Sequence, residues 1–276
     1  MKRLLSGLLL LTVTTGLFAQ EATPANRHTT HAMMFGTGRS NIYDTYLSPS
    51  TYRGPHLSFM RETLRPTHWA DGQVSVQTLL DGYLAYTKTN TASSHELSGM
   101  INYTAGWHYN WQLRCGLRLM AGGGIHGALG AIYNMRNSNN PVQAQAQIYL
   151  SASGMAIYPF HIGKQPFTAR YQLTVPLIGA MFSPQYGQSY YEMSLGNYDH
   201  NVCFTYPVNA PSMRHLLTVD FPINKLTFRV GYLCDIRQST VNNIDAHLWN
   251  HSFMVGYVKH FTFVRRKEPQ HQSFIM

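Results

Sequence analysis

The sequence predicts an all-β protein, a transmembrane antiparallel up-and-down β-barrel of about 12 strands, with a range of roughly 10 to 14. Long stretches alternate apolar and polar residues with a period of two, which is a strand pattern. Beyond the amino-terminal segment there is no run of about 18 apolar residues, so only strands could cross a membrane. Charged residues make up 12% of the chain and aromatic residues 13%, whereas soluble proteins usually have about 25% charged residues. These observations favour a wall with a lipid-facing outside and a polar lumen.

The amino terminus has the layout of a cleaved secretory signal peptide over residues 1–19. Two basic residues precede an apolar run that ends in small residues at Ala19. We expect export and localisation in the outer membrane. Residues 20–31 are then expected to form a periplasmic segment, residues 32–264 the barrel, and residues 265–276 a polar tail.

Residues 101–120 show the alternation most clearly. Odd positions such as Tyr103 are apolar or aromatic, and even positions such as Asn102 are mostly polar or small. This run exceeds the roughly 9 to 11 residues that a tilted strand needs to cross a bilayer. A turn is therefore expected near Asn110 and Trp111.

The same pattern recurs along the chain. An even number of strands would leave both ends in the periplasm. Strands are expected to begin near Ala32, Pro55, Gln73, Leu97, Gln112, Val142, Pro166, Ser189, Val202, Ser212, Leu226 and Leu248. The connections expected outside the cell are residues 87–94, 135–140, 182–192, 208–211 and 239–246, and those expected in the periplasm are residues 109–111, 161–165 and 223–225.

Charge and cysteine content narrow the partners. The net charge of +9 becomes +7 without Lys2 and Arg3, which suits nucleic acid or an anionic lipid surface. Export disfavours nucleic acid, so the expected partners are outer-membrane lipid and the barrel-assembly machinery, with the protein a monomer. Three cysteines allow at most one internal disulfide, and Cys115, Cys203 and Cys234 are expected in the wall.

Charged residues on the polar face have two interpretations. They could form an anion-selective passage, or they could fill a small lumen with paired charges that hold the wall in shape. The abundance of acidic partners favours the filled lumen. The expected lumen residues are Arg114, Arg118, Arg170, Arg229, Arg237, Glu62, Asp81 and Asp235, with Asp220 a further partner.

Some outer-membrane barrels are lipid hydrolases, so serine, histidine and acidic residues were weighed as catalytic candidates. His56 and Ser58 lie two apart and so on one strand face, while Ser189, Glu192 and His200 lie close together in sequence. His56 and Ser58 share the expected luminal face, whereas a lipid hydrolase needs access from the lipid, so hydrogen bonding is the favoured role. The HExxH and CxxC patterns of metal sites do not occur, and the sequence predicts no metal site and no cofactor.

Residues 182–192, FSPQYGQSYYE, are expected at the outer mouth. Pro184 and Gly187 would build a turn, and the next strand would start at Ser189. Tyrosines at this level suit a membrane interface or a cap over the lumen. The expected rim residues are Ser183, Pro184, Tyr186, Gly187, Tyr190 and Tyr191.

Several motifs together resemble an uncharacterised domain-of-unknown-function family of outer-membrane proteins common in Bacteroidota. They are DTYLSP at residues 44–49 followed by Tyr52 and Gly54, residues 182–192, Asp220 with Phe221, and Gln238 with Asn242 and Asn243. The resemblance implies a signal-bearing barrel and supplies no catalytic residues.

The expected function is therefore non-enzymatic, either structural or as a narrow, porin-like channel or transporter for small or apolar solutes. The alternatives are an outer-membrane lipid hydrolase of the phospholipase or lipid A deacylase type, and a soluble secreted β-protein, since a soluble sandwich also alternates.

Overall fold

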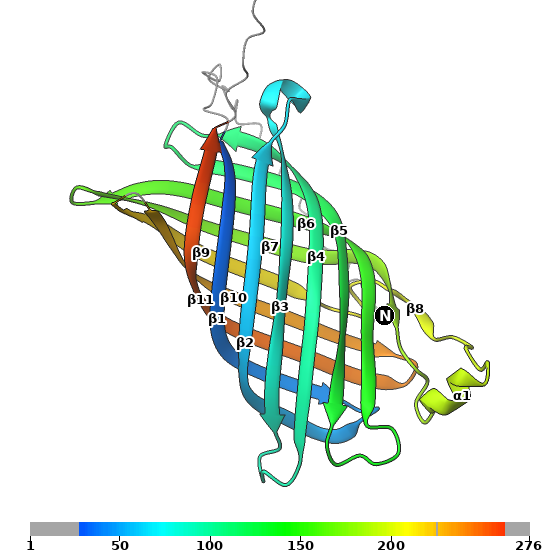
Figure 1. Ribbon diagram of the computed structural model, residues 1–276. Helices are drawn as coiled ribbons and strands as arrows, with labels where there is room; N and C mark the ends of the chain where they lie inside the picture. The colour runs from blue at the N-terminus through cyan, green and yellow to red at the C-terminus, as the bar shows by residue number, and fades with distance from the viewer. Residues whose placement is uncertain (1–27, 225, 263–276) are drawn as a thin grey trace, which may run out of the picture.

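A computed structural model describes residues 28–224 and 226–262, which form an antiparallel β-barrel (Figure 1). Its strands are β1 (His28–Asp44), β2 (Ser48–Pro66), β3 (Val74–Lys88), β4 (His95–Gln112), β5 (Arg118–Asn134), β6 (Val142–Ile162), β7 (Gln165–Phe182), β8 (Val202–Thr205), β9 (Met213–Ile223), β10 (Leu226–Val241) and β11 (Ile244–Thr262). A short 3-10 helix, η1 (Trp69–Gly72), and a helix, α1 (Tyr190–Ser194), complete this part of the chain. No helix in it is long and apolar enough to span a membrane.

Ten strands close the barrel, in the order β1 to β7, then β9, β10 and β11. Closure is made by β11 against β1, whose ladder runs in unbroken register from His28 opposite Thr262 to Asp44 opposite Ala246. Because the number of strands is even, the start of β1 and the end of β11 lie at the same rim of the barrel. The first strand starts at His28, before the expected start at Ala32. The expected signal peptide and the expected polar tail lie outside the described residues.

The expectation of twelve strands is wrong, and the error lies between β7 and β9. Ser189 begins the helix α1 instead of a strand, because its side chain and Glu192 form a capping box. Val202 begins β8, which has four residues and pairs only with the outer end of β7. In Figure 1 both elements stand at the outer end of the barrel, and neither is a strand of the closed wall.

The wall keeps the alternation that the sequence predicts. On β4, Ile101 is 57% exposed and Tyr103 53%, whereas Asn102 between them is 1% exposed because it faces the lumen. The turn after β4 comes at residues 113–117, later than the expected Asn110 and Trp111. Gly116 allows that turn, since its φ of 83° is strained for residues with a Cβ.

Aromatic rings form a continuous row at the rim where β1 starts and β11 ends. Tyr158, Phe160, Phe167, Phe221 and Phe228 contact one another in this order across β6, β7, β9 and β10, with centroid separations from 5.5 to 6.4 Å. Such a row is typical of the girdle at a membrane interface. It marks this rim as the edge of the lipid-facing band.

Connections divide between the two rims as the up-and-down order requires. At the rim where β1 starts and β11 ends, strands are joined by residues 67–73, 113–117 and 163–164 and by the connection after Ile223. At the other rim they are joined by residues 45–47, 89–94, 135–141, 183–212 and 242–243. Asn242 and Asn243 have φ values of 52° and 59°, as a two-residue hairpin turn needs. The longest connection, residues 183–212, lies at the rim expected outside the cell.

Candidate functional site

An ion-pair layer crosses the lumen in its inner half. Glu62 on β2 accepts hydrogen bonds from Arg170 on β7, at 2.7 Å from Nη1 and 2.5 Å from Nη2. It also accepts one from Nη1 of Arg229 on β10, at 2.9 Å. In the ten-strand ring β2 and β7 lie opposite each other, so the Glu62–Arg170 pair spans the barrel. All three side chains are buried.

Amide side chains extend this layer. Gln77 donates to Glu62 at 2.5 Å, and it exchanges hydrogen bonds of 2.9 and 3.0 Å with Gln172. Arg229 completes the network through two bonds to Asp220, at 2.6 and 2.7 Å. Two carboxylates and two guanidinium groups thus balance in charge, as burial of ions requires.

Apolar side chains fill the adjoining lumen. One buried cluster consists of Met34, Met60, Leu79, Leu216, Leu233 and Met254. A second, on β5 and β6, consists of Met120, Met155 and Ile157. Methionine fills irregular spaces well because its side chain is unbranched and flexible. Together with the ion-pair layer these clusters leave the inner half of the lumen packed with side chains.

A second charged group lies nearer the outer mouth. Arg214 pairs with Asp81 at 2.9 Å, and Nη2 of Arg237 donates to Asp235 at 2.8 Å. Arg237 also donates from Nη2 to Asn102 at 2.9 Å, while among the described residues its Nη1 donates only to the Met100 Sδ, at 2.7 Å. A thioether sulfur is a weak acceptor. Nη1 therefore keeps donor capacity for a better partner.

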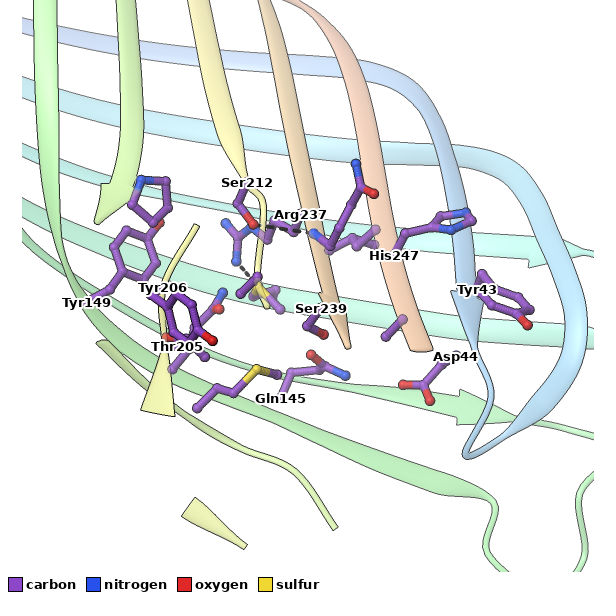
Figure 2. Close-up of a pocket in the computed structure, with 18 of the residues that line it drawn as sticks. Tyr43, Asp44, Gln145, Tyr149, Thr205, Tyr206, Ser212, Arg237, Ser239 and His247 are labelled. Carbon is purple, nitrogen blue, oxygen red and sulfur yellow. Dashed lines mark hydrogen bonds between the residues drawn. The ribbon is translucent and has the colours of Figure 1, made fainter. Parts of the chain in front are cut away.

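Above these residues the outer half of the lumen holds an open pocket (Figure 2). Its volume is about 770 Å³, counting the part continuous with solvent. Its walls carry apolar and aromatic side chains, among them Tyr149, Met181 and Leu248. Polar residues lie between them, namely Asp44, Gln145, Gln147, Thr205, Ser212, Arg237, Gln238, Ser239 and His247. Figure 2 shows Arg237 and Ser239 on one side and Gln145 and Tyr149 on others, all directed at the same space. A cavity that combines apolar walls with polar groups can hold a small molecule.

His56 belongs to a buried hydrogen-bond chain with partners other than the expected Ser58. Its Nε2 lies 2.7 Å from the Ser252 Oγ and its Nδ1 2.9 Å from the Ser40 Oγ. Ser40 donates to Asn250 at 2.6 Å. The hydroxyl of Ser58 has no hydrogen-bond partner within the described residues. Each member of the chain is at most 4% exposed, so the arrangement joins β1, β2 and β11 inside the lumen.

The other catalytic candidates lie apart from this chain. Ser189 accepts a hydrogen bond from the Glu192 backbone N–H at 3.2 Å, and the Glu192 carboxylate accepts one from the Ser189 backbone N–H at 2.7 Å. The Ser189 hydroxyl also donates to this carboxylate at 3.1 Å, and the two bonds that the carboxylate accepts from Ser189 hold the pKa of Glu192 below its usual value. His200 is exposed, and it contacts Asp199 at 2.9 Å. Ser189 and Glu192 thus bond with each other as a helix cap, whereas His200 contacts a different partner.

The expected rim residues lie on the 183–212 connection, which crosses the outer mouth. Tyr190 donates to Gln143 on β6 at 3.1 Å. The Tyr46 hydroxyl, after β1, donates to the Gln188 carbonyl at 2.8 Å, and burial raises the Tyr46 pKa to about 12. Asn242, before β11, donates to the Ser183 carbonyl at 3.0 Å. Contacts at three places on the rim make this connection a fixed cover. The other rim positions on it are Pro184, Tyr186, Gly187 and Tyr191.

Seven of the eight expected lumen residues lie on the inner face, and six of these lie inside the lumen, namely Glu62, Asp81, Arg170, Arg229, Asp235 and Arg237. Arg118 is on the same face but exposed at the start of β5. The placement of Arg114 in the lumen is wrong, because it lies in the exposed turn after β4. The free Cys115 lies in that turn too and not in the wall.

Sequence reasoning missed Gln77, Gln172 and Arg214. All three occupy polar positions within alternating strands, and that signal could have found them. Within the described part of the chain, no three His, Cys, Asp or Glu side chains are grouped to hold a metal ion.

A family model described as "Protein of unknown function (DUF3316)" matches residues 5–268. The chain belongs to this family. No curated protein matches the DUF3316 chain in sequence.

Solved structures similar to this DUF3316 protein are outer-membrane barrels. The transport unit of the autotransporter AIDA-I from Escherichia coli has a TM-score of 0.49 at 8% identity, over 91% of this chain and 94% of that one. The β domain of the Bordetella autotransporter BrkA has a TM-score of 0.45 at 11% identity, over 85% and 100%. The outer-membrane channel COG4313 from Pseudomonas putida F1 has a TM-score of 0.38 at 10% identity, over 85% and 96%.

Proposed function

We propose that this protein is an outer-membrane barrel that does not conduct ions and that binds a small, predominantly apolar solute in the outer half of its lumen, as a narrow transporter. The observation that carries the proposal is the pocket that lies above a packed inner lumen. The wall supports the membrane location, because large apolar side chains such as Leu129, 69% exposed, cover its outside. A closed ring leaves no long free edge, so we expect a monomer. Its partners would be outer-membrane lipid and, during biogenesis, the assembly machinery.

The ion-pair layer supports the absence of conduction. An ion passing through would have to displace Glu62 from both Arg170 and Arg229, and breaking such a buried pair costs about 3–5 kcal/mol. In planar bilayers the purified protein should therefore insert without steady conductance steps. Stable, voltage-independent current would contradict this part of the proposal.

Solute binding is tested with 1-aminoanthracene, a small fluorescent apolar molecule, and protein reconstituted in lipid vesicles. Fluorescence should rise and saturate beyond the signal of empty vesicles. Ser239→Trp, which places an indole in the pocket, should abolish the saturable part. Leu129→Trp, which adds the same side chain to the lipid face, should retain it. A signal that never exceeds partition into empty vesicles would refute the proposed site.

We further propose that the protein is not an enzyme. His56 and Ser252 have the spacing of a base and a nucleophile, which is the one observation that favours a hydrolase. Both are 2% exposed, however, on a face turned away from lipid. Acyl release from phospholipid should stay at the background of empty vesicles for the wild type and for Ser252→Ala alike. Release by the wild type that this substitution removes would establish the hydrolase instead.

A further inference from the structure

The barrel wall is interrupted between β7 and β10 in its outer half. The ladder between β7 and β9 ends at Thr174 opposite Arg214. The ladder between β10 and β9 ends at Ile236 opposite Met213. Beyond these points β7 continues to Phe182 and β10 to Val241, and no strand of the described chain pairs with both.

Two prolines explain why the ladder stops there. Continuing the β7–β9 register would place Pro176 opposite Ser212 and Leu177 opposite Pro211. Proline has no N–H to donate, so it ends or interrupts a ladder. The ladder with β6 is also irregular at this level, since Ser151 faces Pro176 while Leu150 faces Ile178, which leaves Leu177 bulged. The two prolines in the sequence thus account for the interruption of the ladder.

Hydrogen bonds satisfy only part of the backbone edges of β7 and β10 that face the interruption. On β7, β8 pairs with residues 179–182, and residues 175–178 have no ladder partner on that side within the described chain. On β10, the Thr240 N–H donates to the Asn209 carbonyl at 2.8 Å and the Gln238 N–H to the Ser212 Oγ at 3.3 Å. Unpaired backbone at membrane depth is tolerated where it borders a cavity.

The pocket reaches this interruption from the inside. It is lined by Tyr149 and Met181, which share the inner face, and also by Ile178. Ile178 is opposite Leu150 on the lipid face, and the two are 45% and 51% exposed. Pro176 and Leu177 of β7 line it as well, as does Ser212 just before β9. The pocket therefore reaches the stretch of wall where the ladder between β7 and β9 is missing.

Resting on the proposed function, we infer that the solute is a single-chain amphiphile that enters the pocket sideways, from the outer leaflet, through the opening between β7 and β10. Its chain would contact Leu177, Ile178 and Met181. Its head would accept a hydrogen bond from Arg237 Nη1, which among the described residues donates only to a sulfur. The side chains packed in the inner half and the cover over the outer mouth leave the lateral opening as the route for an apolar molecule.

The route is tested by photolabelling in vesicles with a fatty acid that carries a diazirine on its chain, with the corresponding fatty alcohol and with a diazirine phospholipid. Mass spectrometry then locates the adducts. Outward residues such as Ile148 and Leu150 should be labelled by every probe, as an internal control. Inward-facing Tyr149, Gln147 or Met181 should be labelled by the single-chain probes, with unlabelled oleate competing. Labelling of these inward residues by the phospholipid alone would overturn the single-chain assignment.

A variant that restores the missing N–H groups gives a second test. Pro176→Thr with Pro211→Thr should allow the ladder to lengthen and should reduce the inward adducts at least threefold, with outward adducts unchanged. Pro159→Thr, a control elsewhere in the wall, should leave both as in the wild type.

Adducts confined to outward residues in the wild type, with saturable 1-aminoanthracene binding intact, would refute the lateral route and leave the pocket standing. If the wild type shows neither inward adducts nor saturable 1-aminoanthracene binding, the proposed function is refuted as well.

Discussion

Glu62 is expected to contribute more to stability than Arg170, although each is half of the same ion pair. In Glu62→Gln, Arg229 still has Asp220, whereas Arg170 keeps only the Gln172 carbonyl oxygen at 2.6 Å. A buried guanidinium without a counter-charge costs about 3–5 kcal/mol. In Arg170→Gln, the carboxylate keeps Arg229 and Gln77. The loss is then that of charged hydrogen bonds, about 1.5–3 kcal/mol.

The measurement is the free energy of unfolding by urea in lipid vesicles, followed by the loss of the folded band on an unheated gel. Arg114→Gln is the matched control, because Arg114 lies in the exposed turn after β4, away from the ion-pair layer. It should change stability by less than about 0.5 kcal/mol. The double variant should be less destabilised than the sum of the singles. An Arg170→Gln loss that exceeds the Glu62→Gln loss, or strictly additive losses, would refute the assignment of Glu62 as the shared acceptor.

Two further predictions concern α1 and the close contact of β1 with β11. Because the folded-state pKa of Glu192 is lowered, its cap is present above the ordinary pKa of 4.5 and is lost as pH falls through the folded-state pKa. Protease cleavage of the connection should rise on acidification, and Glu192→Gln should remove this pH dependence. Gly38→Ala should destabilise the barrel by about 1–3 kcal/mol, since a Cβ would meet the His251 carbonyl, while Gly127→Ala, with open space at its Cβ, should be neutral. Equal urea midpoints for both variants would contradict this.

Local sequence patterns predicted the wall well. Alternation assigns a residue to one face of a strand because successive side chains point to opposite faces, and it placed Glu62, Arg170 and Arg229 on the luminal face. It failed at Arg114 because the pattern continues past the end of the strand. It also failed at Ser189, where a capping box offered the backbone a helix that competes with the expected strand.

The sequence by itself determined a barrel chain, the two faces of its wall and the positions of most of its turns. Each of these follows from contacts or preferences local in the chain. Only the tertiary structure decided the closure at ten strands and the choice of partners in the lumen. Glu62 and Arg170 are 108 residues apart, and their meeting depends on the register summed around the ring. The lateral opening likewise depends on the tertiary structure, because the barrel's register brings Pro176 and Pro211 to one level of the wall, where β7 and β9 cease to pair.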